Sequence, residues 1–115
     1  MNNRPVSVGK VGSRTTLTKN KIPGTVEKSE DHIQIELPVD APVASVGISV
    51  SAGMSTEFAR EKIEVSAWCT LPSLTDRKSI EATYDTCYSY AAEKAKSSLD
   101  RAVKEFFPDL SREDS

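Results

Sequence analysis

Apolar and polar residues alternate along two neighbouring stretches near the middle of the chain. In the first stretch the apolar positions are Val46, Ile48, Val50 and Ala52. In the second they are Ile63, Val65, Ala67, Cys69 and Leu71. A polar loop that contains Gly53 separates the two stretches. A period of two is typical of strands with one buried face, so the pattern predicts an antiparallel hairpin over residues 46–71.

A shorter alternating stretch precedes this hairpin. Ile33, Ile35 and Leu37 alternate with polar residues, and Pro38 and Pro42 follow them. Proline is tolerated at the edge of a sheet and not in a central strand. Residues 32–39 are therefore predicted to form an edge strand that ends in a turn.

The spacing of apolar residues changes to three and four after the hairpin. These positions are Ile80, Tyr84, Cys87, Tyr88, Ala91, Ala95, Leu99, Ala102, Val103 and Phe106. They predict a helix with Ser73 or Thr75 as its N-cap, which ends near Phe107 because Pro108 follows. The expected fold is α+β, with a three-stranded antiparallel sheet packed on one long C-terminal amphipathic helix.

The predicted helix is longer than the predicted strands. About 30 helical residues span roughly 45 Å, whereas ~8 strand residues span roughly 26 Å. One such sheet leaves the distal half of the helix uncovered, and a second copy of the chain is the simplest cover. The sequence thus predicts at least a homodimer, with Leu99, Val103, Phe106 and Phe107 at its interface.

Charge is distributed unevenly along the 115 residues. Residues 1–26 carry +5 and the remainder carries −7, which together give the formal net charge of −2. The first part is rich in Ser, Thr, Asn, Gly and Lys and shows no sustained period, which favours disorder. The expected organisation is a basic disordered arm over residues 1–28, a sheet-plus-helix domain over 29–108 and a charged tail over 109–115. The arm is either a solvated tail or a segment that settles on phosphates or on an acidic partner.

The chain contains few residues of the kinds that act in catalysis. The chain has one histidine, His32, and two cysteines, Cys69 and Cys87, with no motif that joins them. The cysteines are expected to be free, although pairing between them stays open. We expect no enzyme, no cofactor and no metal site. The absence of a long apolar run or an apolar leader predicts a cytoplasmic protein that does not enter a membrane.

The face of the hairpin that points away from the helix is the candidate binding surface. Ser45, Gly47, Ser49 and Ser51 of the first strand and Arg60, Lys62, Glu64, Ser66 and Trp68 of the second are expected there. An aromatic ring offers nucleic-acid bases a stacking platform, and cations attract phosphates. The predicted nucleic-acid-binding residues are Arg60, Lys62 and Trp68, with Arg4, Lys10, Arg14, Lys19 and Lys21 of the arm. The alternative interpretation is that Trp68 only covers Gly47 or its neighbours, and Glu64 opposes an anionic ligand.

Two resemblances bear on function. Val46-Gly47-Ile48-Ser49-Val50, Gly53, Glu57-Phe58, Lys62-Ile63-Glu64-Val65 and Cys69-Thr70-Leu71-Pro72 resemble a group of small phage-encoded strand-turn-strand-helix proteins of unassigned function. That resemblance implies a phage or mobile-element setting and transfers no catalytic residue. A basic arm, an antiparallel sheet and a long C-terminal helix also resemble the transcriptional-coactivator-like single-strand-binding proteins, as a likeness of architecture alone.

The leading hypothesis is a non-enzymatic protein of phage DNA metabolism in the host cytoplasm that binds single-stranded nucleic acid. One alternative is a virion or assembly component that uses its arm and sheet edge for subunit contacts. The other is an inhibitor whose acidic body occupies a basic site on a host protein.

Overall fold

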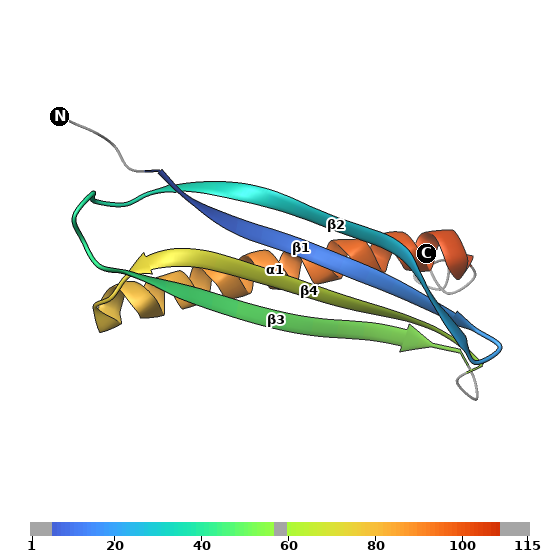
Figure 1. Ribbon diagram of the computed structural model, residues 1–115. Coiled ribbons are helices and arrows are strands. Elements are labelled where there is room, and N and C mark those ends of the chain that lie inside the picture. The colour runs from blue at the N-terminus through green and yellow to red at the C-terminus, as the bar shows by residue number, and fades with distance from the viewer. Residues whose placement is uncertain (1–5, 57–59, 109–115) are drawn as a thin grey trace.

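The computed structural model describes residues 6–56 and 60–108, as four antiparallel strands and one long helix (Figure 1). The strands are β1 (Val6–Lys19), β2 (Ile22–Glu36), β3 (Val43–Ser55) and β4 (Glu61–Leu74), and the helix is α1 (Arg77–Phe106). The strand order in the sheet is β2-β1-β4-β3, and α1 lies along one face. The α+β class and the long C-terminal helix are confirmed. The sheet has four strands where three were predicted.

The additional strand comes from the segment that was expected to be an arm. β1 lies between β2 and β4 and pairs with both, and residues 22–28 form the start of β2. The prediction of an arm is therefore wrong for residues 6–28, and deletion of residues 1–21 would remove a strand that is hydrogen-bonded on both sides. The remainder of the predicted arm, residues 1–5, and the predicted tail, residues 109–115, lie outside the described residues.

The sequence of β1 does not show the alternation of apolar and polar residues that is typical of a strand, because its helix-facing side is largely not apolar. That side carries Gly9, Val11, Ser13, Thr15 and Leu17. Ser13 and Thr15 are nevertheless buried, and the Ser13 hydroxyl lies 3.3 Å from that of Ser98 on α1. Small residues at the centre of β1 let the helix approach the sheet closely. The same small residues remove the hydrophobic alternation that would have predicted a strand.

The predicted hairpin is confirmed as β3 and β4, and it is longer than expected. Ile63, Val65, Ala67 and Cys69 face the helix and are fully buried, so the predicted parity of β4 is correct. The predicted edge strand is also confirmed in position, because β2 ends the sheet on that side. β2 begins ten residues earlier than the predicted strand, at Ile22 rather than His32.

Asp76 caps α1, rather than Ser73 or Thr75. Its carboxylate accepts hydrogen bonds from the backbone N–H of Ser79 at 2.9 Å and from the Ser79 hydroxyl at 2.7 Å. These bonds lower the pKa of Asp76 below its ordinary value. At the other end the backbone N–H of Phe107 bonds to the carbonyl of Val103 at 2.8 Å, one residue before Pro108.

The length mismatch that predicted a helix-mediated dimer is absent. Strands of 13–15 residues span about 43–50 Å at ~3.3 Å per residue, which matches the roughly 45 Å of a 30-residue helix. Val103 and Phe107 are buried in the protomer's own core with Leu17, Ile63 and Val65. These two residues therefore do not form the predicted interface. Leu99 and Phe106 are only partly buried, at the margin of the same core.

Candidate nucleic-acid interface

The outer face of the sheet, opposite α1, is built from ladder rows that run across all four strands. In the order β2, β1, β4 and β3, three central rows are His32-Lys10-Thr70-Gly47, Glu30-Gly12-Trp68-Ser49 and Lys28-Arg14-Ser66-Ser51. In these rows β3 contributes only glycine and serine, and β4 contributes Thr70 and Ser66 on either side of Trp68. The cations and the indole gather toward β1 and β2. The expected outer-face position of Trp68 is correct.

Trp68 lies flat against β1 and points toward β2. A Cβ atom on Gly12 would come within 2.7 Å of both Cε2 and Cζ2 of the indole, so only a glycine leaves room for the ring. The indole N–H donates a hydrogen bond to the carboxylate of Glu30 on β2 at 3.2 Å. The ring thus covers a glycine, as the alternative interpretation held, but that glycine is Gly12 of β1 and not Gly47 or a neighbour.

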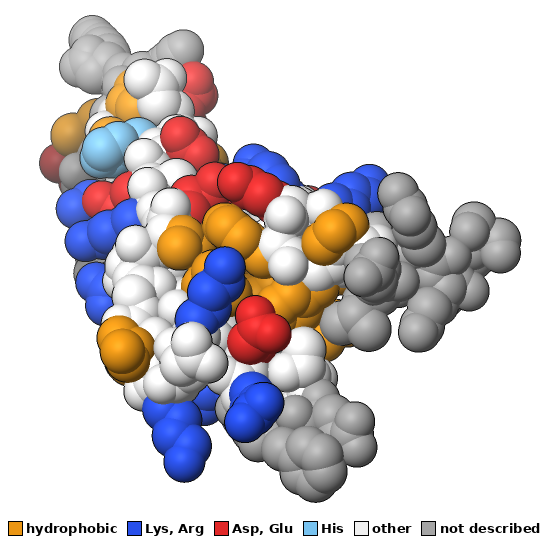
Figure 2. Space-filling view, turned by 90° about the vertical axis from the view of Figure 1, so that its right-hand side faces the viewer, with side chains coloured by type: hydrophobic (Ala, Val, Ile, Leu, Met, Phe, Trp, Pro, Cys, Tyr) orange, Lys and Arg blue, Asp and Glu red, His pale blue; other side chains and the backbone are white. Residues whose placement is uncertain are grey.

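Three cations lie in the rows beside the indole. Lys10 and Arg14 flank Gly12 along β1, and Lys28 is the register partner of Arg14 on β2. All three are exposed, and within the described part of the chain no ion pair engages them. Figure 2 looks at the end of the molecule that carries the β1–β2 turn, and shows Lys and Arg side chains along one side of that end with acidic side chains among them. Sequence reasoning did not select Lys28; its pairing with Arg14 depends on β1, which was not predicted.

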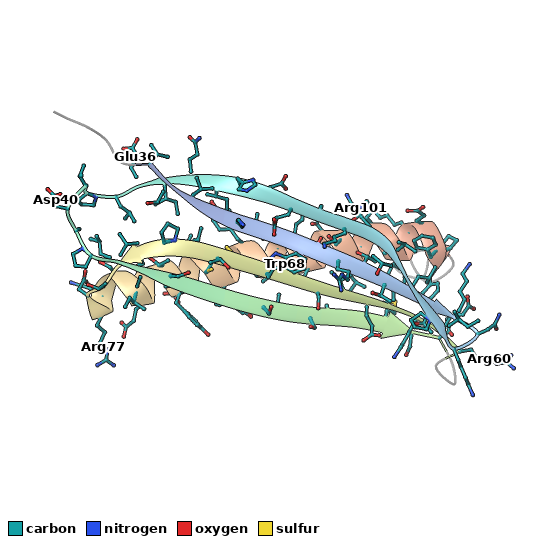
Figure 3. The ribbon with its side chains drawn as sticks, in the orientation of Figure 1. Glu36, Asp40, Arg60, Trp68, Arg77 and Arg101 are labelled. Carbon is teal, nitrogen blue, oxygen red and sulfur yellow. The ribbon has the colours of Figure 1, made fainter. Side chains whose placement is uncertain are left out.

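The other predicted cations gather at one end of the sheet. Lys19 ends β1, Lys21 lies in the β1–β2 turn, and the backbone N–H of Asn20 in that turn bonds to the carbonyl of Arg60 at 3.2 Å. Figure 3 shows Arg60 at this end and Trp68 midway along the sheet. Lys62 is six residues from Trp68 on β4, or about 20 Å away. The structure therefore does not bring Arg60 and Lys62 together with Trp68, as was expected, and Arg4 lies outside the described residues.

Acidic residues moderate the potential of the outer face. Glu64 forms an ion pair with Lys62 at 3.3 Å between Oε1 and Nζ. Glu30 accepts the indole N–H, so its charge lies between the indole and β2. An open depression of about 510 Å³ lies on the outer face from the row of Arg14 toward Glu64, and Arg14, Ser66, Ser51 and Glu64 contribute to its wall. Arg14 is the cation that lines this depression.

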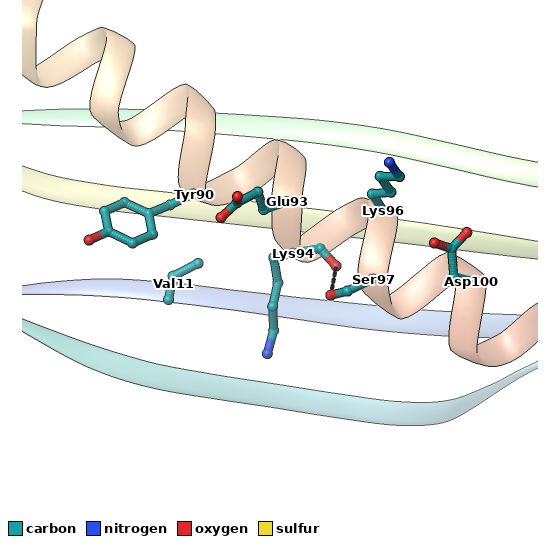
Figure 4. A pocket seen from close by; sticks show the side chains of 7 residues that line it. All are labelled: Val11, Tyr90, Glu93, Lys94, Lys96, Ser97 and Asp100. Carbon is teal, nitrogen blue, oxygen red and sulfur yellow. Dashed lines mark hydrogen bonds between the residues drawn. The ribbon is translucent and has the colours of Figure 1, made fainter.

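A second hollow, of about 580 Å³, runs along the flank of α1 above β1 (Figure 4). Val11 and Tyr90 contribute its apolar surface, and Glu93, Lys94 and Asp100 contribute charges. The Lys94 side chain reaches toward β2, where its Nζ lies 3.7 Å from Oδ2 of Asp31. Arg101 forms a similar ion pair with Glu27. These ion pairs hold α1 against the β2 edge of the sheet. We therefore interpret this hollow as a feature of helix–sheet packing and not as a ligand-binding site.

The two cysteines are buried between α1 and the hairpin. The thiol of Cys87 lies 3.0 Å from the carbonyl oxygen of Cys69 and 3.6 Å from that of Val46, and both cysteines are free. Burial, followed by the neighbouring Cys87 thiol, raises the pKa of Cys69 to about 12. The Cys69 thiol is therefore protonated near neutral pH, and both buried cysteines act as small apolar side chains. His32 is exposed on the outer face of β2, beside Lys10.

No protein-family model, no curated protein and no solved structure matches the chain. Among the described residues, no three His, Cys, Asp or Glu side chains come together as a metal site would require. Within residues 6–56 and 60–108, no helix is both long enough and apolar enough to cross a membrane.

Proposed function

We propose that this protein binds single-stranded nucleic acid, without enzymatic activity, along the outer face of its sheet. In this proposal Trp68 stacks on a base, and Lys10, Arg14 and Lys28 contact the adjacent phosphates. The observation that carries the proposal is the direct pairing of Arg14 with Lys28 across β1 and β2, one row from the indole. The phage setting and a role in DNA metabolism belong to the same proposal and depend on the resemblance described above.

Like charges that face each other across a strand pair destabilise a sheet. Neither Arg14 nor Lys28 forms an ion pair within the described residues, so no direct acidic contact offsets their repulsion. A phosphate that bridges the two would offset it. This arrangement supports an anionic ligand that lies across β1 and β2.

Two features of the indole and its surroundings favour stacking on a base. Its contact with Gly12 and its hydrogen bond to Glu30 hold the ring in one orientation, so little rotational freedom is lost when a base stacks on it. Its neighbours toward the β3 edge are small, with Ser49 in the same row and Gly47 and Ser51 in the next. A flat ligand therefore meets no large side chain on that side.

The test is a titration of the protein with single-stranded oligonucleotide at low salt, followed by the emission of Trp68, the sole tryptophan. We expect quenching in the wild type, and a loss of about 1–3 kcal/mol in binding free energy for Trp68→Ala. Substitution of Lys10, Arg14 and Lys28 together by Gln should reduce the slope of log affinity against log salt by about 2, since each phosphate contact on a single strand contributes ~0.7.

The matched control substitutes three exposed lysines of α1, Lys78, Lys96 and Lys104, by Gln, which changes the net charge by the same amount. This control should leave the salt slope nearly unchanged. Equal effects of the two triple variants would mean that general charge, and not the outer face, governs binding. Absence of quenching at about 20 mM salt would refute the proposal.

An assembly role is the second candidate. The observation that favours it is the outer edge of β3, which carries no charged residue. A role as an inhibitor of a host protein has no comparable support from the described residues.

A further inference from the structure

The two edges of the sheet differ in how they are protected from pairing. The β2 edge contains Pro23, an irregularity in register opposite Thr15 and Thr16, and several charged residues. The β3 edge spans 13 residues, Val43–Ser55, with no proline and no charged residue. β3 pairs with β4 on one side only, so alternate backbone N–H and C=O groups point away from the sheet. Prolines, charges and bulges are the usual protection of edges, and β3 has none of them.

We propose that β3 pairs antiparallel with β3 of a second copy of the chain. The two four-stranded sheets would then form one continuous sheet about a two-fold axis perpendicular to it. Both helices would lie on the same side of this sheet, and the two outer faces would join on the other. This inference does not depend on the proposed nucleic-acid binding.

The side-chain pattern of β3 matches a second copy. Ala44, Val46, Ile48, Val50 and Ala52 point toward the helix side, while the outer side carries serine and glycine except for Val43. Antiparallel pairing that preserves the pleat places apolar residues beside apolar ones and small residues beside small ones. A strand without charge offers nothing that would select a partner of opposite charge. Its own sequence therefore fits it better than a charged peptide does.

The helix supplies a second observation at the same edge. Tyr84 and Tyr88 are each 52% exposed, although their spacing continues the row of Leu99 and Phe106. On the β2 flank of α1, Thr86 lines a hollow with Ile35 and Leu37 of β2, and Lys94 and Arg101 form ion pairs with β2. Tyr84 and Tyr88 each stand two residues from Thr86, which is about 200° around a helix. The two tyrosines therefore lie on the β3 side of the helix. In the paired arrangement, the tyrosine flanks of the two copies face each other across the joined edge.

The experiment measures mass by light scattering across a concentration series, without nucleic acid. The wild type is expected at twice the 12.5 kDa chain mass at high concentration. Ser49→Lys with Ser51→Lys places positive charges on both sides of the joined edge, and should reduce the mass to that of a monomer. The same holds for Ser49→Glu with Ser51→Glu. An equimolar mixture of the two variants should recover the dimer, because opposite charges then meet at the edge.

The control places lysines at exposed positions of the other edge strand, as Thr25→Lys with Gln34→Lys, and should remain dimeric. A measurement that needs no substitution is amide hydrogen exchange of the wild type. Amides of β3 should exchange more slowly at high protein concentration than at low, and those of β2 should exchange equally at both. A monomeric wild type, a dimer that survives both charged variants, or β3 exchange that is independent of concentration would each overturn the proposal.

Discussion

Gly12 is the residue on which the position of Trp68 depends, and Gly12→Ala tests this directly. The added Cβ would lie 2.7 Å from two carbons of the indole and 2.7 Å from the backbone carbonyl oxygen of Ser29. Real Cβ atoms essentially never come within 3.0 Å of a neighbour and ordinary contact begins at 3.4 Å, so these neighbours must move by about 0.3 Å at the least and by about 0.7 Å to reach ordinary contact. The carbonyl is part of the hydrogen-bonded β1–β2 pair, so it cannot move far without disrupting that pair. The indole is therefore expected to move and to lose its hydrogen bond to Glu30.

Excess volume at a packed position costs about 1–3 kcal/mol. We take ~2 kcal/mol as the middle of this range. Each kcal/mol lowers the unfolding temperature of a chain of this size by roughly 4 °C, so the temperature of half-unfolding should fall by about 8 °C. Thermal unfolding by circular dichroism measures this change, and the emission of Trp68 should shift to longer wavelength as the ring lifts into solvent.

The matched control is Gly47→Ala, on the same face of β3. There the nearest atom to an added Cβ is Oγ1 of Thr70, at 3.5 Å, which is ordinary contact. Alanine should be tolerated at this position, with stability equal to or slightly above that of the wild type. If Gly12→Ala leaves both stability and emission unchanged, or if the two variants cost the same, then the indole does not lie on Gly12 as described.

Two further predictions concern the buried layer between sheet and helix. Thr15 is 2% exposed, and its hydroxyl has no hydrogen-bond partner among the described residues. Thr15→Val should therefore raise the midpoint of urea unfolding by the equivalent of about 1 kcal/mol, without a change in the dependence of the unfolding free energy on urea concentration. A lower midpoint would mean that the hydroxyl does have a hydrogen-bond partner. The raised pKa of Cys69 means that the unfolded chain loses this proton near pH 9 while the folded chain keeps it until about pH 12. The contribution of this thiol to stability should therefore be complete below pH 9 and decline above it. Denaturant titrations from pH 7 to 10.5 would measure this, and the unfolding free energy of the wild type should fall more steeply with pH than that of Cys69→Ala.

The sequence determined the elements in which one face is continuously apolar. β4 was predicted with the correct parity because Ile63, Val65, Ala67 and Cys69 alternate without interruption. α1 was predicted over nearly its full length because its apolar spacing of three and four continues to Phe106 and Pro108 then ends it. In both elements the burial of apolar side chains drives the structure, and burial leaves a period in the sequence.

Only the tertiary structure decided the role of β1. Its helix-facing side is built from glycine, serine and threonine with few apolar residues, because α1 approaches it through Ser98 and the small residues beside it. Hydrogen bonds to β2 and β4 hold the strand in place, and backbone hydrogen bonds leave no side-chain pattern to read. The contact of Trp68 with Gly12 and the pairing of Arg14 with Lys28 follow from this strand. Both join residues on different strands, so they exist only once the register of β1 is set.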